Sequence, residues 1–115
     1  MTQLFANNAS TTISPGIGTT DTSVSIVSNT NFPVVSNSGD YFYATLANSG
    51  NTAWEIVKVT ATVGTTFTIT RAQDGTTAAS WTSGSVFEGR VNAQILRDVI
   101  IGDNAYSVAM SIVMG

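Results

Sequence analysis

The chain has 115 residues, only 10% of them charged, and it contains neither histidine nor cysteine. Without thiols or imidazoles it can form no disulfide or zinc–thiolate site, and it lacks the groups that most often carry catalysis near neutral pH. The formal net charge is −3, and its four cations are dispersed among seven acids, which argues against a surface that binds nucleic-acid phosphates.

The hydrophobic fraction of 43% is too high for a disordered chain, and a chain of this length normally forms one domain. Its apolar runs are only a few residues long, so we expect no membrane span. Residues 1–8 have neither the basic nor the apolar region of a secretory signal, so we expect any exit from the producing cell to need another route, for example lysis.

The first part of the chain is polar and then alternates. Residues 1–18 are punctuated by glycine and proline, and we expect them to form an extended arm or loop. In residues 22–28, Val24 and Ile26 share one side and serines the other, which predicts a half-buried strand. A turn at residues 36–40 follows.

The clearest prediction is a β-hairpin. Residues 41–46 form an aromatic-rich strand, and residues 54–62 alternate so that Val57, Val59 and Ala61 face the core. A turn at residues 63–65, with glycine supplying the permissive backbone, leads to a partner strand at residues 67–71.

A short strand at residues 86–91 completes the predicted core domain, residues 19–91. Strands about ten residues apart with turns between them are typical of a small barrel or sandwich. We therefore predict an all-β fold, a small β-barrel or sandwich of about six to eight strands, with one short C-terminal helix.

Residues 92–115 differ from the rest and are expected to make assembly contacts. An apolar stripe predicts a helix over residues 93–101, and a continuous strand is the rival interpretation. The last segment alternates again and either closes the domain's own sheet or pairs with another subunit. The candidate subunit-interface residues are Tyr106, Val108, Met110, Ile112, Leu4 and Phe5.

No catalytic, cofactor-binding or metal-binding residue is predicted. The absence of histidine excludes a Ser-His-Asp triad, and nothing in the spacing of the carboxylates Glu55, Asp74, Glu88 and Asp98 indicates that two of them meet. Charged side chains spaced through strands usually face solvent. Arg71, Asp74 and Arg90 are expected to form a hydrogen-bonded cluster that fixes the loop after the hairpin.

The two tryptophans, Trp54 and Trp81, allow two interpretations. They are core or interface anchors, which is the favoured interpretation, or they form a sugar-stacking platform on an exposed face.

Several segments together resemble a small β-rich module of tailed-bacteriophage virion proteins, in particular the N-terminal part of tail-fibre and baseplate proteins. The resemblance covers residues 4–91. Its parts are residues 4–12, 39–42, 54–60 and 70–78, Trp81 and residues 84–88. The most specific are Glu-Ile-Val-Lys-Val-Thr and Arg-Ala-Gln-Asp-Gly-Thr-Thr-Ala. The family often has glycine where this chain has Ala72, and it continues into a long fibre shaft, which this sequence lacks.

The resemblance implies a structural protein without catalytic residues, assembled in the host cytoplasm into the virion. We expect a tail or baseplate adaptor or a fibre-attachment subunit whose partners are copies of itself and other virion proteins. A capsid decoration protein is the alternative within this class. A carbohydrate-binding module is the alternative from another class, and an enzyme is the least favoured.

Overall fold

The computed structural model describes residues 3–4 and 9–90, and this part of the chain is all-β. The six strands are β1 (Ser10–Thr12), β2 (Ser23–Ser25), β3 (Phe42–Ala47), β4 (Trp54–Val63), β5 (Thr66–Gln73) and β6 (Val86–Glu88). The predicted fold class is confirmed. The helix predicted over residues 93–101 lies outside the described residues.

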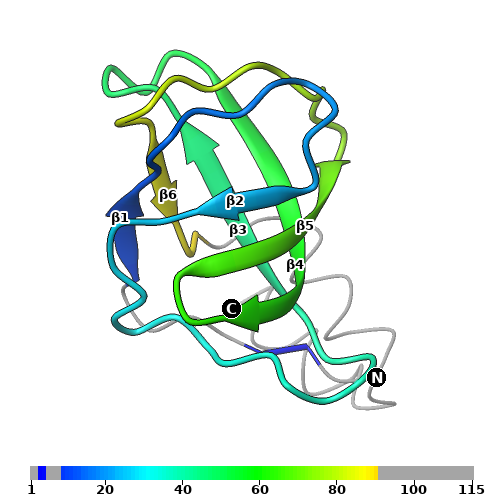
Figure 1. Ribbon diagram of the computed structural model, residues 1–115. Coiled ribbons are helices and arrows are strands. Elements are labelled where there is room, and N and C mark those ends of the chain that lie inside the picture. Colours follow the sequence, from blue (N-terminus) through cyan, green and yellow to red (C-terminus); the bar gives the residue numbers. More distant parts are fainter. Residues whose placement is uncertain (1–2, 5–8, 91–115) are drawn as a thin grey trace, which may run out of the picture.

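The strands form one antiparallel sheet in the order β1-β6-β3-β4-β5-β2. The sheet curls into a half-barrel, so that β2 and β5 pass in front of β3 in Figure 1. The two ends of the sheet meet through a bridge between Ile13 and Ile26, where the Ser14 N–H donates to the Ser25 carbonyl. Because its outer strands bond to each other there, the sheet leaves little free edge.

The predicted hairpin is present as β4 and β5, with Val63 paired to Thr66 across a tight turn. Gly64 has a φ of 60°, a backbone conformation that glycine adopts at little cost. The ladder is interrupted further along, because Ile56 pairs with Gln73 whereas Lys58 pairs with Thr70. β5 therefore carries one extra residue there, which is a β-bulge.

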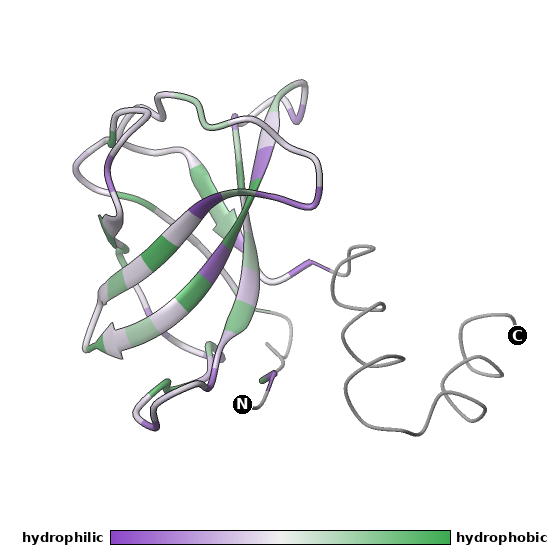
Figure 2. Cartoon of the chain, turned by 90° about the vertical axis from the view of Figure 1, so that its right-hand side faces the viewer, coloured by the Kyte–Doolittle hydropathy of each residue, from purple (hydrophilic) through white to green (hydrophobic). Residues whose placement is uncertain are grey.

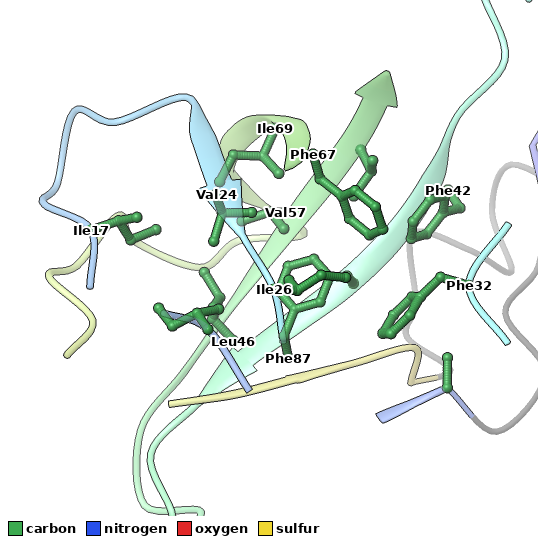
Figure 3. Packing of buried hydrophobic residues seen from close by; sticks show 14 of the residues in the cluster. Ile17, Val24, Ile26, Phe32, Phe42, Leu46, Val57, Phe67, Ile69 and Phe87 are labelled. Atoms are coloured by element: carbon green, nitrogen blue, oxygen red, sulfur yellow. The ribbon is translucent and has the colours of Figure 1, made fainter. Parts of the chain in front are cut away.

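Alternation along the strands gives the sheet an apolar inner face (Figure 2). Val57 and Val59 of β4 are fully buried as predicted, whereas Ala61 is only half-buried. Four phenylalanines, Phe32, Phe42, Phe67 and Phe87, meet at the centre of the core with ring centroids 5.5–6.1 Å apart (Figure 3).

β3 is buried along its whole length, although its side chains alternate between two faces. Phe42, Ala44 and Leu46 belong to the main core, while Tyr43 joins Tyr41 and Ile56 in a second, smaller cluster on the other face. The centre of the sheet is therefore packed on both sides.

The described part of the N-terminal arm predicted over residues 1–18, residues 3–4 and 9–18, contacts the sheet. β1 lies within it and pairs with β6, and Ile13 is completely buried. Ile17 forms a second contact, a bridge to Trp81. A strand of three residues is too short to show an alternating pattern in the sequence. The apolar residues of this segment are spaced four apart and not two, because the backbone from which they enter the core is irregular.

Candidate functional site

The most unusual side chain of the barrel is Glu55, a glutamate on the inner face of β4 whose side chain is 0% exposed. Its carboxylate accepts five hydrogen bonds. Arg71 donates twice, from Nε to Oε2 and from Nη2 to Oε1, both at 2.9 Å. The backbone N–H groups of Ala72 and Ala79 donate at 3.0 Å, and Nε1 of Trp81 donates at 2.9 Å. The carboxylate is thus surrounded by donors, as a buried charge must be.

Arg71, on β5, uses all five of its N–H donors. Besides the two bonds to Glu55, its Nη1 donates to the carbonyls of Gly18 (2.6 Å) and Asp21 (2.9 Å). Nη2 also donates to the Ala79 carbonyl at 2.6 Å. The side chain is 8% exposed, so these bonds replace those to water. One guanidinium therefore joins β4 to the loop before β2 and to the loop after β5.

The local backbone explains how these groups converge. The bulge in β5 falls at Ala72, whose φ is +56°, and it turns the Ala72 N–H toward Glu55. Asp74 and Gly75 follow with φ values of 52° and 77°, and Thr76 N–H donates to the Gln73 carbonyl, the pattern of a type I′ turn.

Thr76 then fastens this turn to β4. Its Oγ1 accepts from the Ile56 N–H at 3.0 Å and donates to the Gln73 carbonyl at 2.6 Å. The residue after Glu55 and the turn after Arg71 are therefore held together independently of the ion pair.

The electrostatics of Glu55 follow from these contacts. Burial by itself raises the pKa of the carboxyl, but the hydrogen bonds from Arg71, Trp81, Ala79 and Ala72 outweigh it and lower the pKa below its ordinary value. Glu55 is therefore ionised at neutral pH, opposite a guanidinium. The hydrogen-bonding groups of Glu55 and Arg71 are already occupied by contacts within the domain. The ion pair therefore holds four chain segments together.

Two of the three residues predicted to form a loop-fixing cluster, Arg71 and Arg90, bind different carboxylates. Arg71 does fix loops, but its donors are spent on Glu55 and on carbonyls. Arg90 instead donates to Glu88 and Asn51, at 3.0 and 2.9 Å, in a partly exposed pair. Asp74 occupies the type I′ turn.

The tryptophans have different environments. Trp81 is 6% exposed and anchors the core, as the favoured interpretation expected, whereas Trp54 is 57% exposed on the outer side of β4. Among the interface candidates, Leu4 packs against its own core and its N–H donates to the Tyr41 carbonyl. The other candidates, Phe5, Tyr106, Val108, Met110 and Ile112, lie outside the described residues.

Glu55 was not predicted as a core residue, because charged residues in strands usually face solvent. The sequence nevertheless contains a pattern that indicates its burial. Glu55 has the same parity as Val57 and Val59, the residues assigned to the core, so the alternation itself placed it inside.

Among residues 3–4 and 9–90, no group of three or more acidic side chains is arranged to hold a metal ion. The same residues include no helix long and apolar enough to cross a bilayer. Comparison with models of known protein families gives no match, and a search among curated proteins gives no significant match.

Proposed function

We propose that this chain is a structural subunit of a tailed-bacteriophage virion, a tail or baseplate adaptor or a fibre-attachment subunit. The observation that carries the proposal is the convergence of the segments on which the resemblance rests. Glu55 comes from the Glu-Ile-Val-Lys-Val-Thr segment, and Arg71 and Thr76 come from the Arg-Ala-Gln-Asp-Gly-Thr-Thr-Ala segment. Trp81 joins them at the same site.

The chemistry of that site supports an architectural role. Its most specific residues join strands and loops within one small domain, as the Glu55 and Arg71 contacts illustrate. A virion part must keep its shape under load and in dilute surroundings without turnover of any substrate. A buried, fully hydrogen-bonded ion pair helps to fix the shape of the domain, because it specifies one arrangement of the surrounding loops.

The test is to locate the chain on particles of the phage that encodes it. Antibodies raised against the purified protein, carrying gold, should label intact particles at the tail or baseplate in electron micrographs. Label on the head would favour a capsid decoration protein instead. Purified particles without label, from lysates that contain the protein, would contradict a virion role altogether.

A carbohydrate-binding module remains the second candidate because of the exposed indole of Trp54. The preceding turn is rigid, since Oδ1 of Asn48 accepts the N–H groups of Thr52 and Ala53. Asn51 in that turn binds Arg90, which brings polar groups to the same turn. An aromatic face beside fixed polar groups is a common sugar site.

Glycan-array binding by the purified protein, lost in Trp54→Ala and kept in Val63→Ala, would support this candidate. Val63 is a fitting control because it is exposed at the opposite end of β4. Absence of binding in the unmodified protein would remove the candidate.

A further inference from the structure

Two neighbouring segments of the described sheet contain no charged residue. Residues 22–39 and residues 59–70 contain no Asp, Glu, Lys or Arg. The two segments are neighbours, because β2 pairs with the first half of β5. The Val35 N–H also donates to Oγ1 of Thr62 at 2.9 Å, and Nδ2 of Asn29 donates to the Gly64 carbonyl at 3.1 Å. We call residues 26–36 and 60–66 the hairpin end.

Three of the four large hydrophobic side chains exposed on the described residues belong to the hairpin end. Val27, Val34 and Val63 are 64%, 73% and 79% exposed. Val34 and Val63 each adjoin the hydrogen-bonded pair of Val35 and Thr62. A single exposed valine is ordinary, but three on two neighbouring segments without a charged residue are typical of a contact site.

The hairpin end is also anchored to the hydrophobic core. Phe32, in the loop between Val27 and Val34, enters the core and packs against Phe67 and Phe87 at 5.8 and 5.5 Å. The valines on either side of it are therefore presented on an anchored loop. A surface fixed before association loses less conformational entropy on binding.

We propose that the hairpin end is the surface through which this chain binds a second copy of itself. The polar groups around the valines are hydroxyls and amides, which both donate and accept hydrogen bonds, so the surface can complement its own copy. The chain has a net charge of −3, and an uncharged end brings two copies together without like charges in the contact.

This inference deepens the proposed function and rests on it for its biological meaning, since a virion subunit works through contacts with its neighbours. It is nevertheless testable on the purified chain. Gold labelling of particles and self-association in solution are separate measurements, so that either proposal can fail while the other stands.

The experiment is sedimentation velocity of the full chain over a wide concentration range. Val34→Lys with Val63→Lys puts two cations on the hairpin end, and their exposure leaves the core untouched. Thr77→Lys with Ser80→Lys makes the same change in charge at exposed sites outside it. We expect the unmodified chain and the control to associate alike and the hairpin-end variant to show a Kd at least tenfold higher. A chain that stays monomeric, or a hairpin-end variant that associates as tightly as the control, would overturn the proposal.

Cross-linking supplies an independent readout because the chain has no cysteine of its own. Single-cysteine variants Val34→Cys and Val63→Cys, treated with a short bismaleimide, should form covalent dimers faster than Thr77→Cys. Equal rates at all three positions would contradict a contact at the hairpin end.

Discussion

Glu55 and Arg71, separated by 16 residues in the sequence, form a two-pronged ion pair inside the barrel with both N–O distances at 2.9 Å. The pair is buried on both sides, with side-chain exposures of 0% and 8%. Both partners also bind the backbone of Ala79. The Glu55 carboxylate accepts from the Ala79 N–H, and Arg71 donates to the Ala79 carbonyl. The ion pair therefore determines where the loop after β5 lies.

Glu55→Gln should lower the free energy of unfolding by about 3–5 kcal/mol, the usual cost of leaving one member of a buried ion pair without its partner. The amide would also place donor hydrogens where N–H groups of Arg71, Ala72, Ala79 or Trp81 already point. Urea denaturation at pH 7 measures the change.

Glu88→Gln is the matched control, because Glu88 also pairs with an arginine but has a side-chain exposure of 30%. An exposed pair of this kind contributes about 0–1 kcal/mol. Equal losses in the two variants would mean that burial of the Glu55 pair has no energetic importance.

The free energy of unfolding should fall in acid because Glu55 becomes protonated. Its pKa is lowered in the folded chain, so the unfolded chain takes up the proton first. The contribution of Glu55 is therefore complete above the ordinary carboxyl pKa of about 4.3 and is lost as the pH falls below it through the lowered value. The stability difference between the unmodified chain and Glu55→Gln should narrow between pH 5 and pH 3 (approximate limits) when unfolding is measured at each pH. A constant difference over that range would contradict the assignment.

Trp81→Phe should cost about 1.5–3 kcal/mol, because it keeps an aromatic ring in the core but removes a hydrogen bond to a charged acceptor. With one donor fewer, the pKa of Glu55 rises, and the midpoint of acid unfolding should move to higher pH. Trp54→Phe is the control, since that indole is 57% exposed. Similar losses in both variants would show that the bond from Nε1 of Trp81 to Glu55 is unimportant.

The sequence predicted the regular parts of this fold well. Alternation placed Val57 and Val59 in the core and located the β4–β5 hairpin, because two long strands around a glycine turn carry their own periodicity. It could not reveal that β1 belongs to the sheet, since three residues are too few to alternate.

The candidate site was only partly predictable. Arg71 was expected to fix a loop, and it does, but its partner was not identified. Pairing Arg71 with Glu55 depends on a bulge at Ala72, and Ala72 reads as an ordinary strand residue. Long-range contacts of this kind follow from the register of two strands, which a local pattern does not specify.

Gly16→Ala should destabilise the chain by about 1–3 kcal/mol, the range typical of a steric clash that forces the backbone to shift. A Cβ at Gly16 would lie 2.5 Å from the Trp81 carbonyl oxygen and 3.0 Å from the Ser83 nitrogen, both backbone atoms. If the two backbone segments moved apart to relieve this clash, the backbone hydrogen bonds between Ile17 and Trp81 would be strained. Gly50→Ala is the control, because its nearest neighbour would be a methyl group at 4.0 Å. Thermal unfolding of both variants tests this, and an unchanged midpoint for Gly16→Ala would refute it.

Ala72→Gly should stabilise the chain, which is unusual for a glycine substitution. Ala72 has a φ of +56°, a conformation that costs an L-residue about 1–2 kcal/mol and glycine almost nothing. The added freedom of the unfolded chain offsets about 0.4–1 kcal/mol of this gain, so a net increase of about 0.5 kcal/mol is expected. Ala53→Gly, at an exposed position without positive φ, should instead lower stability. Opposite signs in urea denaturation are the expected result. A loss in both variants would mean that the bulge does not strain Ala72.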